Sequence, residues 1–185
     1  LRLMDKLFVE PVDKVYACCD TLITAQDVAS ASRFQNERRR REHLAWRRVV
    51  RRELGRDVDI DYNAVGAPVV SIPNIYISVS HSGSVVAVAI GDERVGVDVE
   101  RVHRCFDRVQ SRYMSGAEAV LSDVEWWPAA VWCAKEAMYK YYGIPGVALV
   151  GDLVVEDYDA STSIMSGRMC GREAVSIAIS CYDEY

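Results

Sequence analysis

Two carboxylates at alternate positions, Asp98 and Glu100, are the first residues in this sequence that could do chemistry. Side chains of an extended strand alternate between its faces, so these two share a face, with α-carbons about 6.6 to 6.8 Å apart. A solvated strand face is the ordinary explanation of such a pair. A divalent cation is the alternative, because carboxylate oxygens suit Mg²⁺, whose site is commonly completed by waters and substrate phosphates.

A second group lies in the segment WCAKEAMYK, where helical spacing places several side chains on one side: Trp132, Lys135, Glu136, Tyr139 and Lys140. A surface ion pair between Glu136 and Lys140 is the ordinary interpretation, worth about 0.3 to 0.5 kcal/mol. The large Trp132 beside it favours a packed site instead. From spacing alone, Glu136 as a third metal carboxylate and the plain surface pair both stay open.

A third group is the arginine-rich run of residues 37–42, ERRRRE. Such runs commonly form a solvated helix face or a nucleic-acid contact. The whole chain has 22 Lys and Arg against 27 Asp and Glu, a net charge of -5. This balance argues against a surface devoted to nucleic acid, while a local anion site is still allowed.

Hydrophobic periodicity predicts the elements that must position these groups. Trp46, Val49, Val50 and Leu54 form one apolar stripe in a helical region over 25–54, which Gly55 ends. The other predicted elements are strands over 75–79, 85–90 and 95–100, a turn over 81–84, a helix over 129–142, and strands over 149–155 and 174–181. This order predicts an α+β protein whose two halves meet near residues 93–96.

Composition limits the class of protein. The 185 residues are 50% apolar, enough for a sizeable core. The six cysteines, including adjacent Cys18 and Cys19, show no metal-ligand spacing and no disulfide framework, which indicates free thiols in a reducing compartment. No apolar run reaches the roughly 18 to 20 residues of a membrane span, and charges interrupt residues 1–10. We expect a soluble cytoplasmic protein without a membrane partner.

Taken together, the Gly96-x-Asp98-x-Glu100 strand and the Trp132-x-x-Lys135-Glu136-Ala-x-x-Lys140 helix resemble the signature of the 4'-phosphopantetheinyl transferase superfamily. Further matches are Ser80-His81-Ser82, Gly66-Ala67-Pro68 and the arginine-rich helix. The length is similar to the larger, surfactin-synthetase-activating type. That type implies a monomer with two similar α/β halves, related by pseudo-twofold symmetry, and an active site between them.

The resemblance implies one domain for each half of the chain. Residues 1–94 would recognise the nucleotide and 3'-phosphate of coenzyme A. Residues 95–185 would carry the metal site, the catalytic helix and a carrier dock. The implied reaction moves the 4'-phosphopantetheine arm of coenzyme A onto a serine of an apo acyl or peptidyl carrier protein and releases adenosine 3',5'-bisphosphate. Mg²⁺, or alternatively Mn²⁺, would be required.

The resemblance also implies roles in the catalytic half. Asp98, Glu100 and Glu136 would hold the metal ion. Glu136 itself, or a metal-bound water, would take the proton of the carrier serine. Lys140 would stabilise or protonate the departing phosphate, and Lys135 would contact a phosphate. Glu118 matches a further acidic position whose role the resemblance does not define.

The implied coenzyme A contacts lie in the first half. Arg38 and Arg41 would bind the 3'-phosphate, joined by His81 from its turn, with Ser80 near the pyrophosphate. Gly66 and Pro68 would shape the nucleotide turn, in which Ala67 replaces the lysine usual in the family. We expect this replacement to weaken coenzyme A binding unless a nearby arginine compensates.

The segment of residues 106–127 would form the carrier dock, with Arg112, Tyr113 and Met114 as its candidate contacts, although its tryptophans could simply be core. Three alternatives stay open. One is a nucleic-acid-binding protein that uses the arginine helix; another is a metal-dependent nucleotide hydrolase. The third is a family member that binds a carrier but is impaired in transfer.

Overall fold

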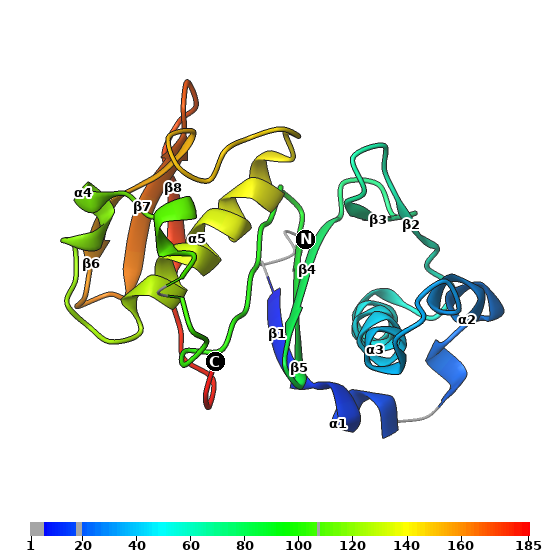
Figure 1. Ribbon diagram of the computed structural model, residues 1–185. Helices are drawn as coiled ribbons and strands as arrows, with labels where there is room; N and C mark the ends of the chain where they lie inside the picture. The colour runs from blue at the N-terminus through cyan, green and yellow to red at the C-terminus, as the bar shows by residue number, and fades with distance from the viewer. Residues whose placement is uncertain (1–5, 18–19, 107) are drawn as a thin grey trace. The chain divides into compact units, whose positions relative to one another are not determined.

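The computed structural model describes residues 6–17, 20–106 and 108–185 (Figure 1). The chain divides into two compact units, an amino-terminal unit over Leu1–Val95 and a carboxy-terminal unit over Gly96–Tyr185. Each unit contains a three-stranded antiparallel sheet and one long helix. The predicted α+β class is therefore confirmed at the level of mixed helix and sheet.

The elements of the amino-terminal unit begin with a strand that the sequence analysis missed, β1. In chain order they are β1 (Lys6–Pro11), α1 (Val12–Ala17), a 3₁₀ turn η1 (Asp20–Leu22), α2 (Ala25–Ala31), α3 (Glu37–Leu54), β2 (Ile60–Tyr62), β3 (Pro68–Val70), β4 (Tyr76–Ser82) and β5 (Val85–Gly91). The sheet order is β1-β5-β4, and β2 and β3 form a separate hairpin. The central strand β5 is thus hydrogen-bonded on both edges.

The core of this unit lies between α3 and the sheet. Trp46, Val49 and Val50, the predicted stripe of α3, are buried in one cluster with Val88 and Ile90 of β5. The helix begins after Asn36, whose side chain accepts a hydrogen bond from the backbone of residue 39, and it ends at Gly55 as predicted. The predicted helical stripe is therefore confirmed.

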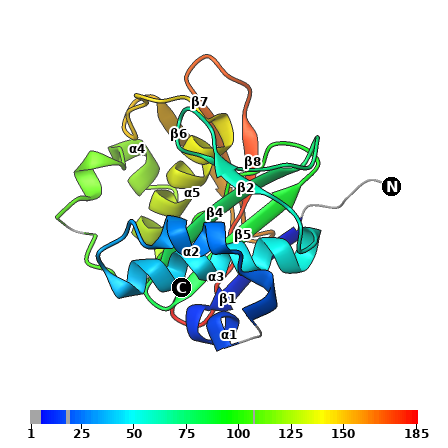
Figure 2. The same ribbon diagram turned by 90° about the vertical axis from the view of Figure 1, so that its right-hand side faces the viewer.

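A buried charge network joins α2 to α3, the two helices labelled at the front of Figure 2. Thr24 caps α2 by accepting a hydrogen bond from the backbone nitrogen of Asp27, and the Asp27 carboxylate accepts in return from the backbone nitrogen of Thr24 at 2.9 Å. The same carboxylate pairs with Arg51 and, at 3.2 Å, with Nε of Arg47. His43 lies beside this network: its Nδ1 accepts from Arg47 at 3.2 Å, so its Nε2 donates to the Ser30 hydroxyl at 3.0 Å. These contacts hold the imidazole in its neutral form.

The carboxy-terminal unit places its sheet against one helix. Its elements are a 3₁₀ turn η2 (Gln110–Arg112), α4 (Gly116–Ala119), α5 (Trp127–Tyr142), β6 (Leu153–Asp159), β7 (Ile164–Met169) and β8 (Val175–Ala178). The strand order is β6-β7-β8. Helix α5 begins two residues before its predicted start and ends at Gly143, which adopts the left-handed conformation at φ 63°.

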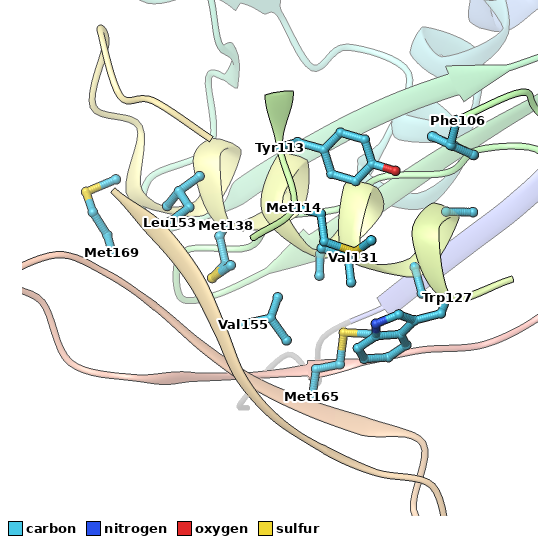
Figure 3. Packing of buried hydrophobic residues seen from close by; sticks show 13 residues of the cluster. Phe106, Tyr113, Met114, Trp127, Val131, Met138, Leu153, Val155, Met165 and Met169 are labelled. Atoms are coloured by element: carbon cyan, nitrogen blue, oxygen red, sulfur yellow. The ribbon is translucent and has the colours of Figure 1, made fainter. Parts of the chain in front are cut away.

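Apolar side chains of α5 and of β6 and β7 form the core of this unit (Figure 3). Val131 and Met138 of the helix, Leu153 of β6 and Met165 of β7 are all buried. A Cβ atom at Gly167 would lie 2.9 Å from the sulfur of Met138, so the glycine lets the helix approach the sheet. This packing fixes which side of α5 is available for a site.

Several predicted elements need correction. Strands β4, β5, β6 and β8 lie where strands were expected, but β7 was missed because its residues mix glycine, polar and charged types. His81 belongs to β4, and the turn consists of Gly83 and Ser84. The predicted strand over 95–100 is wrong: residues 94–100 form neither strand nor helix. Alternation predicts an extended chain, but a strand also needs a hydrogen-bonded neighbour.

The cysteines and the helices agree with the sequence analysis as far as the structure describes them. Cys105, Cys133, Cys170 and Cys181 are free thiols, while Cys18 and Cys19 lie outside the described residues. Within residues 6–17, 20–106 and 108–185, every helix is too short or too polar to span a lipid bilayer.

His43 gives a testable pH dependence. Burial, followed by the charge of Arg47, lowers the pKa of His43 to about 4, against 6.5 for an exposed histidine. The unfolded chain therefore binds the extra proton first, and stability falls as the pH drops from 6.5 towards 4. We expect this residue alone to cost about 2 kcal/mol between pH 7 and pH 5.

The measurement is urea unfolding of the wild type and of His43→Gln at both pH values. The variant should lose about 2 kcal/mol less than the wild type on acidification, whatever its stability at pH 7. Equal pH dependence in the two proteins would show that His43 is not held neutral.

Candidate functional site

The segment that carries the two predicted carboxylates, residues 96–100, packs along helix α5. A Cβ atom built on Gly96 would lie 2.1 Å from the carbonyl oxygen of Ala137 and 3.0 Å from the Cβ of Tyr141. Only glycine permits this approach. The segment therefore lies against the helix instead of joining a sheet.

Asp98 meets the last turns of α5 through Lys140. The ammonium of Lys140 donates to Oδ1 of Asp98 at 2.7 Å and to the carbonyl oxygen of Val97 at 2.8 Å. The side chain of Asp98 is largely buried, and that of Lys140 is about three-quarters buried. This pair fixes the first predicted metal carboxylate beside the predicted phosphate-binding lysine.

Glu136 and Cys133 lie on the same side of α5 as Lys140, because positions 133, 136 and 140 fall at helical spacing. Burial and then the negative charge of Asp98 raise the pKa of Glu136, while Lys140 opposes the rise. Burial also raises the pKa of Cys133, as do the charges of Asp98 and Glu100 and a hydrogen bond with Asp98. Both carboxylates of the segment thus act on this helix face.

Glu100 is paired with a neighbouring cation. Oε2 of Glu100 binds the guanidinium of Arg104, and its Oε1 accepts from the backbone nitrogen of Arg101 at 2.9 Å. The guanidinium of Arg104 also lies 5.6 Å from the ring centroid of Trp132. Trp132 is therefore packed against the site, which agrees with its interpretation as more than a neighbour of a solvated ion pair.

The donor chemistry of these three carboxylates suits a hard cation such as Mg²⁺. In the arrangement shown, however, Asp98 is paired with Lys140 and Glu100 with Arg104. Among the described residues, no three His, Cys, Asp or Glu side chains are close enough together to hold a metal ion. An ion bound here would have to displace these two cations from the carboxylates.

Lys135, although next to Glu136 in sequence, faces the interior of the unit. Its side chain is 1% exposed, and its ammonium binds Oε1 of Glu118 at 2.7 Å and the carbonyl oxygen of Leu149 at 2.8 Å. The expectation that Lys135 shares a side with Glu136 and Lys140 is therefore wrong. A phosphate contact from Lys135 would require this buried ion pair to open.

Glu118, for which the sequence analysis defined no role, is a buried acceptor of hydrogen bonds from three elements of the unit. Its carboxylate accepts from Lys135, from the backbone nitrogen of Ser115 at 2.7 Å and from that of Val155 at 2.8 Å. Burial alone would raise the pKa of Glu118, but these hydrogen bonds hold it below its usual value. Glu118 therefore ties α4, α5 and β6 together.

In the amino-terminal unit, the arginine that meets His81 is Arg39. Nη1 of Arg39 lies 2.6 Å from Nε2 of His81. Arg38 donates to Oε1 of Glu42 at 2.8 Å, and Arg41 pairs with Asp13 at 2.5 Å. The predicted grouping of Arg38, Arg41 and His81 is thus replaced by Arg38, Arg39 and His81 around Glu42.

The other predicted nucleotide contacts lie on neighbouring elements of this unit. Ser80 is buried on β4, one residue before His81. Gly66, at φ 80°, and Pro68 belong to the turn and second strand of the β2–β3 hairpin, where the side chain of Asn63 accepts from the backbone of Ala67 at 2.9 Å. The turn therefore forms without the lysine that Ala67 replaces.

The predicted carrier contacts separate by exposure. Tyr113 is fully buried and donates to the carbonyl oxygen of Pro128 at 3.0 Å, and Met114 is in the same core. Arg112 is exposed. Trp127 is also core, with its indole nitrogen bonded to the carbonyl oxygen of Glu118 at 2.9 Å. Arg112 is thus the one of the three predicted contacts that a partner could reach.

Sequence reasoning missed Arg39, Glu42, Arg104 and Cys133. Glu42 stood three and four residues after Arg39 and Arg38, the helical spacing of an ion pair, which was the available signal. Nothing in the spacing showed that this glutamate is buried. Cys133 carried no signal, because a single cysteine in a helix has no paired ligand spacing.

Comparison with known families gives one match. Residues 94–180 match the family model ACPS, described as the 4'-phosphopantetheinyl transferase superfamily. The match covers a little under half of the chain and includes Asp98, Glu100, Glu118, Glu136 and Lys140. No curated protein matches the chain.

The close approach at Gly96 predicts a large effect of one methyl group. In Gly96→Ala the new Cβ must displace either the segment or the backbone of Ala137, at a cost of about 2 to 3 kcal/mol. Gly116→Ala is the matched control, since a Cβ there meets nothing within 4 Å. Thermal unfolding should show a clear loss for the first variant and little for the second; similar values would contradict the close contact.

The buried pair predicts a different pattern. Glu118→Gln leaves the ammonium of Lys135 buried without its counter-charge and should destabilise the chain by about 3 to 5 kcal/mol. Adding Lys135→Met removes that charge, so the double variant should be more stable than Glu118→Gln alone. Chemical denaturation compares the three proteins, and a double variant no more stable than the single one would rule out an uncompensated charge as the cause.

Proposed function

Since residues 94–180 belong to the 4'-phosphopantetheinyl transferase superfamily, we propose that this chain transfers the phosphopantetheine arm of coenzyme A to a serine of an apo carrier protein. The observation that carries the proposal is the contact of Lys140 with Asp98 on the face of α5 that also carries Glu136. A carboxylate and an ammonium at one point suit a reaction that removes a proton and stabilises a leaving phosphate.

Asp98, Glu100 and Glu136 would hold a Mg²⁺ ion, with Mn²⁺ as a substitute. Their oxygen atoms suit a hard cation, and this superfamily is generally Mg²⁺-dependent. When bound, the ion supplies Lewis-acid polarisation of the pyrophosphate of coenzyme A. Release of Asp98 from Lys140 and of Glu100 from Arg104 would free their oxygens for this role.

Protein side chains would remove the proton of the carrier serine and stabilise the leaving group. The serine oxygen of the carrier forms a bond to the phosphorus that bears pantetheine, and the bond from that phosphorus to the bridging oxygen breaks. The proton of the serine would pass to Glu136, a half-buried carboxylate whose pKa is raised by burial and by the charge of Asp98. The bridging oxygen leaves as adenosine 3',5'-bisphosphate, and Lys140 compensates its developing charge.

The amino-terminal unit would bind the nucleotide end of coenzyme A. Arg38 and Arg39 would present guanidinium groups for the 3'-phosphate beside the imidazole of His81, and we propose Arg39 in the place first given to Arg41. Ser80 precedes His81 on β4 and keeps its proposed place near the pyrophosphate. Gly66 and Pro68 keep their proposed places at the nucleotide.

The carrier would dock on the exposed part of the segment between the two motifs. Arg108 and Arg112 are exposed there, and Val120 is 82% exposed on the same connection. Cationic groups beside an apolar side chain suit an acidic partner that also buries some apolar surface. We propose that the chain performs this reaction as a monomer in the cytoplasm.

The test is a transfer assay with coenzyme A, Mg²⁺ and a panel of apo carrier proteins, read by mass spectrometry of the carriers. The wild type should add the phosphopantetheine mass, and chelation of Mg²⁺ should abolish the addition. Glu136→Gln should slow it by about 100-fold or more, because the base is lost. Glu156→Gln is the control, since Glu156 pairs with Arg168 on the sheet.

Each failure has a distinct meaning. Carriers that bind without gaining mass would identify a carrier-binding protein that does not transfer. Hydrolysis of nucleotides without a carrier would identify a hydrolase, and salt-sensitive DNA binding without transfer would identify a nucleic-acid-binding protein. Any of these outcomes would overturn the proposed transferase.

A further inference from the structure

Glu42 is a buried carboxylate with two exposed arginines and a partly buried histidine around it. Its side chain is 1% exposed, whereas those of Arg38, Arg39 and His81 are 65%, 51% and 31% exposed. Arg38 binds Oε1 of Glu42 at 2.8 Å. On Oε2, Nη1 of Arg39 lies at 3.5 Å and Nδ1 of His81 at 3.3 Å. Two residues from α3 and one from β4 therefore converge on a single acid.

The burial of Glu42 needs a reason. Its Oε2 is shielded from solvent and, within the described part of the chain, accepts no hydrogen bond of ordinary geometry. A buried carboxylate oxygen in this condition is costly and rare. The ion pairs with Arg38 and Arg39 and the nearby imidazole of His81 offset part of the cost, but exposed arginines do not need such a partner to be stable. We therefore infer that the buried carboxylate orients the arginines around it more than it stabilises the fold.

The neighbouring arginines of the same helix are directed elsewhere. Nε of Arg40 donates to the carbonyl oxygen of Phe34 at 2.6 Å, and Arg41 pairs with Asp13. Of the four consecutive arginines, the first two are thus gathered on Glu42. Selection of two side chains out of a run distinguishes an organised site from a generally basic helix face.

The charges of the cluster define the ligand. Two guanidinium groups outweigh one carboxylate, so the exposed side carries a net positive charge. Guanidinium groups bind phosphate oxygens through paired hydrogen bonds. The cluster also lies within the first two turns of α3, where the helix dipole favours an anion. A phosphate monoester, with its two negative charges, fits these features.

We propose that Glu42 is a positioning residue that holds Arg38, Arg39 and His81 together as a receptor for a nucleoside 3'-phosphate. This inference rests on the proposed function, in which the 3'-phosphate is that of coenzyme A. Glu42 itself touches no substrate. It acts by keeping the two guanidinium groups and the imidazole aimed at one point before the phosphate arrives, which lowers the ordering cost of binding.

The experiment measures the preference for a 3'-phosphate. Isothermal titration gives the Kd values of coenzyme A and of 3'-dephospho-coenzyme A for each protein. The wild type should prefer coenzyme A by about tenfold or more, as expected for charge-assisted hydrogen bonds. Glu42→Gln, which keeps the side-chain volume, should reduce that preference to about threefold or less and leave binding of the dephospho compound unchanged.

Two further variants complete the design. Glu53→Gln is the matched control: the same substitution on the same helix, at a glutamate paired with Lys6 and Arg52. It should keep the wild-type preference. Arg39→Gln alters a half-exposed side chain and should also lose the preference. If Glu42→Gln does not fold, a preference retained in Arg39→Gln still overturns the inference.

Contrary outcomes are specific. A wild-type preference in Glu42→Gln, or tighter coenzyme A binding in that variant, would overturn the positioning role. A full preference in Arg39→Gln would show that the cluster does not bind the 3'-phosphate. Equal affinities of the wild type for both compounds would overturn the inference, while transfer to a carrier in the separate mass assay would still support the proposed function.

Discussion

The carboxy-terminal unit depends on the buried ion pair between Lys135 and Glu118. The ammonium is fully enclosed and bound at 2.7 Å, so α5 cannot rotate about its axis without breaking the pair. One residue along, Glu136 then projects about 100° away around the helix, which directs it to the side that meets Asp98. The pair also draws in Ser115 and Val155, so the orientation of the helix face that carries Glu136 and Lys140 is set by the core on the opposite side of the helix.

The second constraint on this site is the space that Gly96 leaves. Because the backbone of the segment lies directly on Ala137, the carbonyl oxygen of Val97 and the carboxylate of Asp98 come within reach of a single ammonium, that of Lys140. Helix α5 and the irregular segment of residues 96–100 thus form one continuous surface. The glycine of the motif is required for packing, and the carboxylates two and four residues later depend on it for their position.

The sequence located the helix of the candidate site better than the segment that packs against it. Lys140 does contact Asp98, and the helix that holds Lys140 was found from its motif and periodicity. The strand over 95–100 was wrong, because alternation cannot tell a sheet strand from an extended segment that a helix covers. The placement of Lys135 was wrong because its burial depends on Glu118, seventeen residues away, and helical spacing gives no information on such a partner.

Helix α3 shows that a run of charged residues in the sequence does not reveal the partner of each side chain. Its arginines appear in the sequence as a basic run suited to a solvated face or a nucleic-acid contact, yet the structure gives them separate tasks. Arg47 and Arg51 are buried against Asp27, Arg48 donates to the carbonyl oxygen of Val15 at 2.6 Å, and Arg52 pairs with Glu10 at 2.6 Å. A surface that binds a nucleic-acid backbone needs a stripe of cations open to solvent. Most cations of α3 are instead paired with carboxylates of the same unit, and the two exposed arginines at its start, Arg38 and Arg39, share the buried carboxylate of Glu42.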